Sequence, residues 1–147
     1  MARNAGRDVA VIGGGIGGLT AALAFARRGA HVTVYEQAPA LTEVGAGLQI
    51  TPNGARALTA LGIRKALDAT GISADAVLPM DAISGAPVAR FDLSSQSPKY
   101  RFFHRAALLD ILARGCEAAG VQVKLGCKIA ALDPDGSFQV DTETIRP

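Results

Sequence analysis

Apolar residues in the first part of the chain fall into short runs separated by glycines. Residues 8–12 (DVAVI) are β-branched and apolar on both faces, which predicts a fully buried strand. The next pattern has helical spacing over residues 16–28, and Gly29 follows it in the position of a C-terminal cap. Residues 31–35 (HVTVY) predict a second strand. A strand, a helix and a strand in so short a stretch require a right-handed crossover and a parallel strand pair.

The remainder of the chain mixes helical and strand patterns. Helical spacing recurs in three segments, residues 53–61, 63–70 and 105–119. Two or three short strands are expected within residues 75–103, and another at residues 121–125. Residues 127–132 and 137–142 are expected to pair as a hairpin around a turn at residues 134–136 (PDG).

One glycine cluster carries candidate chemistry. Gly13, Gly15 and Gly18 make the pattern G-x-G-x-x-G between the first strand and the first helix, and Glu36 ends the second strand. The first glycine permits a tight turn, the second lets the backbone approach a pyrophosphate, and the third lets the helix lie close to the strand. The helix N-terminus then offers unpaired N–H groups to the diphosphate. Because Glu36 is expected to accept hydrogen bonds from ribose hydroxyls, the site suits FAD or NAD better than NADP.

Composition and charge bear on the number of domains and on whether the chain binds nucleic acid, a membrane or a metal. The chain has 147 residues, 49% hydrophobic and 19% charged, which fits one packed domain. A formal net charge of +2, with scattered basic residues, does not favour a nucleic-acid surface. Residues 9–26 are uncharged, as in a membrane span or signal peptide, but their clustered glycines argue against both. The spacing of Cys116 and Cys127 indicates neither a zinc site nor a disulfide framework, and a reduced, cytoplasmic setting fits it.

Three segments resemble, in order, the single-component flavoprotein aromatic hydroxylases, of which the para-hydroxybenzoate and salicylate hydroxylases are familiar members. The segments are VIGGGIGGLTAALAFARRGAHVTVYEQ, EVGAGLQITPNGARALTALGI and FFHRAALLDIL. The first is shared by many FAD and NAD proteins, whereas the second and third are more specific. Together they indicate FAD as the nucleotide.

The resemblance implies a set of cofactor-binding positions. They are Gly13, Gly15, Ile16, Gly18, Glu36, Gln37, Val44, Gly45, Ala46, Gly47, Arg105 and Ile129. Residues 44–47 match a loop beside the flavin ring, where glycines allow close backbone approach. Arg105 matches an arginine near the FAD diphosphate, and a solvated charge is the alternative for it. Ile129 matches a position whose backbone meets the adenine edge, and an ordinary core residue is an equal alternative. No residue is singled out as catalytic, and no metal site is expected.

The resemblance also implies an α/β fold, a Rossmann-like FAD-binding βαβ domain of the glutathione-reductase type with a small antiparallel β insertion from the substrate side. Residues 1–74 and 104–147 would form the FAD-binding domain, incomplete at its C-terminus, and residues 75–103 would supply strands of the substrate-domain sheet. Two motifs that the family carries further downstream are absent from this sequence. We therefore expect the chain to correspond to the N-terminal third to half of such an enzyme, and to be inactive alone.

The complete enzyme would be a flavin-dependent monooxygenase that hydroxylates a small aromatic substrate with NADH or NADPH and O₂. Two other functions stay open: another FAD- or NAD-dependent oxidoreductase, and a nucleotide-binding fragment without catalytic competence. Neither a nucleic-acid nor a membrane partner is expected. The sequence leaves the aromatic substrate, the choice of nicotinamide cofactor and the oligomeric state open.

Overall fold

The structure is a computed structural model, and it describes residues 5–42, 45–140 and 143–146. The described residues divide into two compact units. The first unit comprises the chain before Gly45 and from Leu108 onward, and the second comprises residues 45–107. Among the described residues, no helix has the length and apolar character that crossing a membrane would require.

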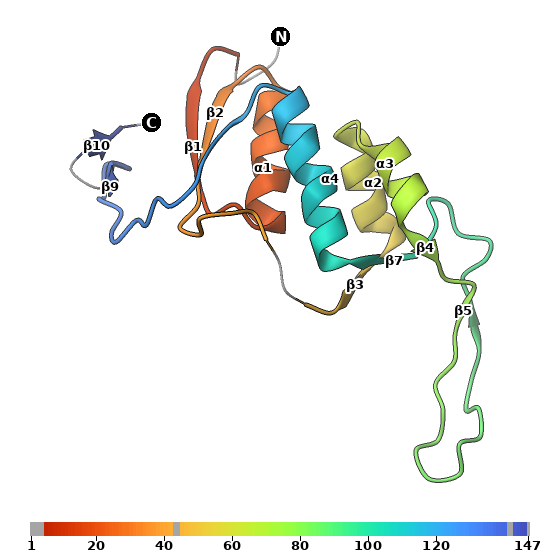
Figure 1. Ribbon diagram of the computed structural model, residues 1–147. Helices are drawn as coiled ribbons and strands as arrows, with labels where there is room; N and C mark the ends of the chain where they lie inside the picture. The colour runs from red at the N-terminus through yellow and green to blue at the C-terminus, as the bar shows by residue number, and fades with distance from the viewer. Residues whose placement is uncertain (1–4, 43–44, 141–142, 147) are drawn as a thin grey trace. The chain divides into compact units, whose positions relative to one another are not determined.

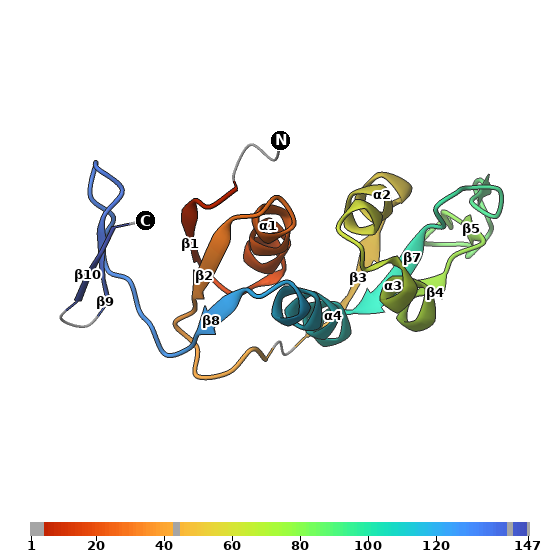
Figure 2. The ribbon, with the colours of Figure 1, turned by 90° about the horizontal axis from the view of Figure 1, so that it is seen from above.

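The first unit is built on a three-stranded parallel sheet with the order β1-β2-β8. Its strands are β1 (Asp8–Ile12), β2 (His31–Tyr35) and β8 (Gln122–Lys124), and its helices are α1 (Ile16–Ala26) and the part of α4 (Arg105–Ala118) that begins at Leu108. Both helices lie on one face of the sheet (Figures 1 and 2). The parallel pairing of β1 with β2 confirms the predicted strand-helix-strand unit.

The core of this unit lies between the helices and the middle strand. Its most deeply buried side chains are Leu19, Leu23, Val34, Leu108, Leu112 and Cys116. The Cys116 thiol donates a hydrogen bond to the carbonyl oxygen of Leu19 at 3.2 Å, which joins α4 to α1. Burial raises the pKa of the Cys116 thiol, so this group stays protonated at neutral pH and acts as a small apolar side chain. The helical pattern predicted for residues 105–119 is confirmed by α4, whose apolar residues are buried in this core.

Two details of the βαβ unit differ from the prediction. The first strand is not fully buried, because β1 is at the edge of the β1-β2-β8 sheet, and Ile12 keeps 50% of its surface exposed. The first helix ends at Ala26 rather than at residue 28, because Arg27 already caps it. Neither difference moves the glycine cluster, which still connects β1 to α1.

The expected hairpin of residues 127–132 with 137–142 is wrong in its partner strand. Residues 127–132 form no strand, and a single bridge between Leu132 and Phe138 is their backbone pairing with β9 (Phe138–Val140). The side chains of Cys127 and Ile129 pack against the cluster that contains Phe138. The strand that pairs antiparallel with β9 is β10 (Glu143–Ile145). The turn at residues 134–136 does form, since the Gly136 N–H donates to the Asp133 carbonyl at 2.9 Å. Phe138, 1% exposed, packs edge-on against Tyr35 with ring centroids 5.2 Å apart.

The second unit contains an antiparallel sheet with the order β3-β7-β4, next to two helices that contact each other. The strands are β3 (Gly47–Ile50), β7 (Arg101–His104) and β4 (Ile72–Ser73). The helices, α2 (Pro52–Ala60) and α3 (Arg64–Thr70), confirm the helical patterns predicted there. Pro52 occupies the first turn of α2, where its missing N–H group would have no partner in any case.

A separate two-stranded ribbon completes this unit. It consists of β5 (Ala76–Val77) and β6 (Phe91–Asp92), which pair antiparallel. The segment between them turns back at Asp81, whose carboxylate accepts hydrogen bonds from Ser84 N–H and Ser84 hydroxyl, both at 2.7 Å. The two or three strands predicted for residues 75–103 are therefore present as β5, β6 and β7, although the first two are only two residues long.

Candidate functional site

The glycine-rich loop turns directly from β1 into α1. Gly13 follows the last residue of β1 and has φ = 100°, a left-handed conformation that side chains other than glycine rarely adopt. Its N–H group donates a 2.8 Å hydrogen bond to the Tyr35 carbonyl, which fixes the loop to the end of β2. The predicted tight turn therefore forms where the carboxyl ends of two parallel strands meet, the edge at which open α/β sheets bind ligands.

Gly18 confirms the expected close approach of helix and loop. A β-carbon built at this position would lie 1.9 Å from the backbone oxygen of Gly13, a distance that no side chain could occupy. Gly15 behaves differently, because a β-carbon there meets no atom within 4 Å. The absence of a side chain at Gly15 thus leaves open space in front of the helix rather than permitting contact within the protein.

That open space faces the N-terminus of α1. Gly15 is the N-cap residue and provides no side-chain hydrogen bond to the helix, and the first turn contains no acidic residue. The first N–H groups of a helix have no partner within the helix, and together they carry a partial positive charge. An eleven-residue helix that begins in this way offers an uncompensated anion-binding end.

Glu36 lies immediately after β2 and is held by backbone groups on both sides. Its Oε1 accepts a hydrogen bond from the N–H of Ala38 at 2.8 Å, and its Oε2 accepts one from the N–H of Gly14 at 2.5 Å. The hydrogen bond from Ala38, followed by that from Gly14, holds the pKa of Glu36 below its usual value against the opposing effect of desolvation. Each carboxylate oxygen keeps further acceptor capacity, so the ionised side chain can still bind hydroxyl groups.

Two hollows meet at this carboxylate. The smaller, of about 110 Å³, is lined by Gly14, Gly15, Glu36, Ala38, Ala40, Leu41, Thr42 and Leu109. The larger, of about 210 Å³, is lined by Ile12, Gly13, Tyr35, Glu36, Gln37, Cys127 and Ile129. Glu36 lines both, and the structure therefore brings the glycine loop, Glu36, Gln37 and Ile129 together in one region.

Sequence reasoning missed three residues of this region, Gly14, Tyr35 and Cys127. Gly14 donates to Glu36, Tyr35 accepts from Gly13, and the N–H of Cys127 donates to the Glu36 carbonyl at 2.8 Å. For Gly14 the sequence held a signal, because it is the middle one of three consecutive glycines. In the structure, a β-carbon there would lie 2.8 Å from a Leu41 methyl group. Cys127 carried no local signal, since only the pairing of β2 with β8 brings the residues that follow these two strands together.

A larger hollow of about 480 Å³ lies along the same sheet, near Asp8, His31 and Gln122. These residues are at the amino ends of the parallel strands, opposite the glycine loop. Because ligands of such sheets bind outside the carboxyl ends of the strands, we assign the functional site to the glycine loop and Glu36.

The other predicted site residues belong to the second unit or lie outside the described residues. Val44 falls outside them. Gly45 and Ala46 lead into β3, whose first residue, Gly47, is the register partner of His104 on β7. Arg105 follows His104 as the first, exposed residue of α4. The structure thus places Gly47 and Arg105 close together at one end of the β3-β7 pair, in a unit separate from the glycine loop.

Known proteins are similar to this chain over most of its length. A family model described as "FAD binding domain" matches residues 7–143. The 3-amino-4-hydroxybenzoate 2-monooxygenase of Streptomyces cremeus is 39% identical over 132 residues, which cover 86% of this chain and 34% of that protein. The 3-hydroxybenzoate 6-hydroxylase 1 of Aquipseudomonas alcaligenes is 37% identical over 128 residues, covering 83% of this chain and 32% of that protein.

Solved structures of an oxygenase and a monooxygenase have a similar fold. The tetrameric form of 2-methyl-3-hydroxypyridine-5-carboxylic acid oxygenase matches with a TM-score of 0.86 and 27% identity, covering 95% of this chain and 37% of that one. The p-nitrophenol 4-monooxygenase PnpA from Pseudomonas putida matches with a TM-score of 0.82 at 17% identity, and this likeness concerns the mixed α/β fold alone. The chain spans about a third of the length of the relatives that it matches.

Proposed function

Because this chain belongs to the family of FAD binding domains, we propose that it provides the FAD-binding part of a flavin-dependent monooxygenase. The reaction that we propose is hydroxylation of a small aromatic substrate with NADH or NADPH and O₂. Relatives that the chain matches are named as monooxygenases or hydroxylases of hydroxybenzoates. We therefore take an aromatic carboxylic acid that already bears a hydroxyl group as the substrate class. We also propose the cytoplasm as the location.

The observation that carries the proposal is that the open N-terminus of α1 lies next to the ionised carboxylate of Glu36. Gly13, Gly15, Ile16 and Gly18 would hold the diphosphate, since a β-carbon at Gly15 would project into open space where a phosphate is expected. Glu36 would accept hydrogen bonds from the adenosine ribose. Gln37 and Ile129, which line the 210 Å³ hollow next to Glu36, would meet the adenine end.

A second group of residues is proposed to act at the flavin end. Residues 44–47 would lie along the flavin ring, and the open space around Gly45 supports close backbone approach there. Arg105 would reach the diphosphate region with its planar guanidinium. In domain terms, we propose a glutathione-reductase-type FAD domain from residues 1–74 and 104–147, with residues 75–103 inserted from the substrate-domain sheet.

Bound FAD would supply the redox chemistry, accepting a hydride and reacting with O₂. The residues of this chain bind and orient it. The helix N-terminus and Glu36 fix the nucleotide half, so that the rest of the cofactor has a defined direction. The glycines at positions 45 and 47 remove the side chains that would keep a planar ring away from the backbone. None of these tasks requires a proton to be transferred by the described residues.

The test is retention of flavin by the purified chain. FAD is added, unbound cofactor is removed by gel filtration, and the absorption spectrum of the protein fraction is recorded. We expect flavin bands that are lost in the Gly15→Val and Glu36→Ala variants and kept in a Gly17→Ala control, whose added β-carbon also meets open space but lies beyond the N-cap. Flavin retained equally by all variants would contradict the assigned site, and retention of NAD in place of FAD would contradict the flavoprotein function.

A further inference from the structure

The second unit contains a cavity that the proposed cofactor site does not use. It has a volume of about 310 Å³ and lies between the two short helices and the segment that leads into β7. Its lining comes from Ala55 and Thr59 of α2, from α3, from residues 95–99 and from Arg101. A volume of this size is at the lower end of the range of small-molecule sites.

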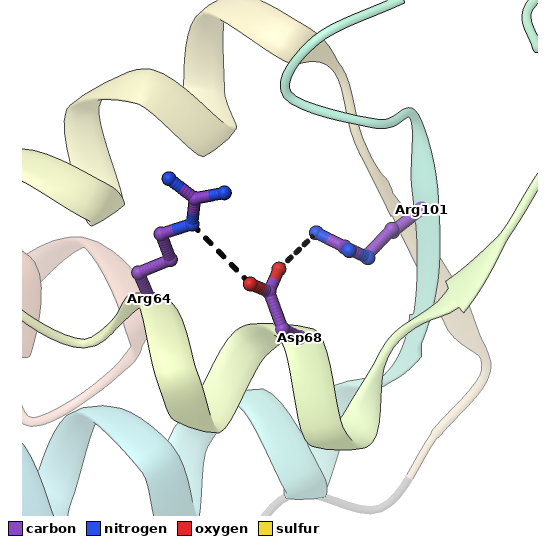
Figure 3. A network of polar contacts seen from close by, with 3 residues as sticks. All are labelled: Arg64, Asp68 and Arg101. Atoms are coloured by element: carbon purple, nitrogen blue, oxygen red, sulfur yellow. Dashed lines mark hydrogen bonds and ion pairs between the residues drawn. The ribbon is translucent and has the colours of Figure 1, made fainter.

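Positive charge is in excess around this cavity. Arg64, Lys99 and Arg101 line it, and Asp68 is the carboxylate that faces them. Asp68 is bound on both sides, by Arg64 Nε at 3.3 Å and by Arg101 Nη1 at 2.7 Å, as Figure 3 shows. Lys99 donates a hydrogen bond to the carbonyl oxygen of Ser94. One carboxylate is thus shared by two guanidinium groups, and the cavity keeps a net positive charge that an anion would balance.

Two polar atoms at the cavity are buried and unsatisfied. Arg101 Nε and Gln96 Oε1 have no hydrogen-bond partner among the residues that the structure describes. The Arg101 side chain is only 15% exposed, whereas that of Arg64 is 70% exposed. Buried polar groups in native proteins are almost always hydrogen-bonded, so both atoms call for a partner that the protein does not provide. Arg101 Nε–H requires an acceptor, and Gln96 Oε1 requires a donor.

The remaining lining indicates what else a ligand must contain. Ala55, Leu67 and Pro98 present carbon surface to the cavity. A bare inorganic anion would leave that surface without contact, whereas an organic acid would cover it. We propose that this cavity binds a small organic acid that carries a hydroxyl group. Its carboxylate accepts the Arg101 Nε–H, its hydroxyl donates to Gln96 Oε1, and its carbon skeleton packs against Leu67 and Pro98. This site is independent of the FAD site.

The experiment is a titration of the ¹⁵N-labelled chain, followed by two-dimensional NMR at constant pH and ionic strength. Lactate is the probe, and propionate is its matched partner because the two differ only in the hydroxyl group. We expect a saturable shift of the Arg101 Nε–H signal, which is identified by its loss in the Arg101→Lys variant. We expect propionate to bind about tenfold more weakly, because it leaves Gln96 Oε1 buried without a donor.

Two variants and one control separate binding from folding. Arg101→Lys keeps the charge but removes the Nε–H donor, and we expect its lactate affinity to fall at least about tenfold. Gln96→Met leaves the ion pairs of Asp68 intact, and we expect it to abolish the preference for lactate over propionate. Arg114→Lys, in an exposed ion pair with Asp110 on α4, is the control and should bind as the unchanged chain does.

The proposal fails if lactate produces no saturable shift. It also fails if propionate binds as tightly as lactate, or if Gln96→Met retains the preference. Tighter binding of inorganic phosphate than of lactate would replace the organic acid by a phosphate group and overturn the assignment. Each of these results is independent of whether the chain retains FAD.

Discussion

The contact at Gly18 makes the structure of the glycine loop testable by two neighbouring substitutions. In Gly18→Ala, the new β-carbon would start 1.9 Å from the Gly13 carbonyl oxygen. Carbon–oxygen contacts are not normally closer than about 3.3 Å, so the loop and helix must separate by roughly 1.4 Å. Overpacking of this kind costs about 1–3 kcal/mol, and a backbone obstacle places it near the upper end. The better helix propensity of alanine returns about 1 kcal/mol, which leaves a net loss of about 2 kcal/mol.

Gly17→Ala is the matched control, because its β-carbon meets nothing within 4 Å and the residue lies in the same helical turn. Alanine should stabilise that position by about 1 kcal/mol, the same propensity gain as at Gly18. For a domain of this size, about 2 kcal/mol corresponds to a fall in Tm of roughly 4–8 °C for Gly18→Ala, against a small rise for Gly17→Ala. Both changes in Tm are measured by thermal unfolding without FAD, with circular dichroism as the signal. A Gly18→Ala chain that unfolds at or above the temperature of the unchanged chain would refute the close approach of helix and loop.

Two further predictions concern Glu36 and Phe138. The pKa of Glu36 is lowered in the folded state, so its ionised form stabilises the fold above its unfolded pKa, and this stabilisation is lost as the pH falls through the folded pKa. Urea unfolding at pH 7 and pH 3 should therefore show a smaller loss of unfolding free energy on acidification in Glu36→Gln than in the unchanged chain or in the exposed control Glu117→Gln; equal losses would contradict the role of its backbone hydrogen bonds. Phe138→Ala should lower the free energy of unfolding by about 3–5 kcal/mol and speed hydrogen exchange in β9, because the buried ring packs on Tyr35. Phe91→Ala, at a residue 58% exposed on β6, should change stability by less than about 0.5 kcal/mol, and similar effects of the two substitutions would contradict the packing.

The arrangement of the glycine loop beside Glu36 could be predicted because its constraints are local. Gly13, Gly15 and Gly18 each serve a requirement that operates within a few residues: a turn, an open approach and a close contact. Glu36 was identified from its position at the end of the next strand, and the parallel register of β1 with β2 places it beside the loop. Gly45, Ala46, Gly47 and Arg105 are in the second unit. The part of these residues, of the glycine loop and of Glu36 in cofactor binding stays a prediction.

The two errors in the predicted strands arose where a strand's pairing partner or its place in the sheet depends on distant parts of the sequence. Residues 127–132 and 137–142 have the alternation and the turn of a hairpin, yet the N–H of Cys127 donates to the carbonyl of Glu36 instead. Cys127 thus pairs with the residue that follows β2, and β9 pairs with β10. In the same way, the apolar run of β1 predicted burial on both faces, but exposure depends on its place at the edge of the sheet.

The sequence by itself determined the strand-helix-strand unit, the glycine-rich turn within it and the carboxylate that follows β2, because these depend on side-chain periodicity and on the absence of a β-carbon at particular positions. The tertiary structure alone decided that Gly14 donates to the Glu36 carboxylate, and that Cys127 lines the hollow beside it. It also decided that Arg64 and Arg101, far apart in sequence, share Asp68 beside a cavity. Such pairings depend on which distant segments compete for the same strand edge or carboxylate, and no periodicity within one segment encodes the outcome of that competition.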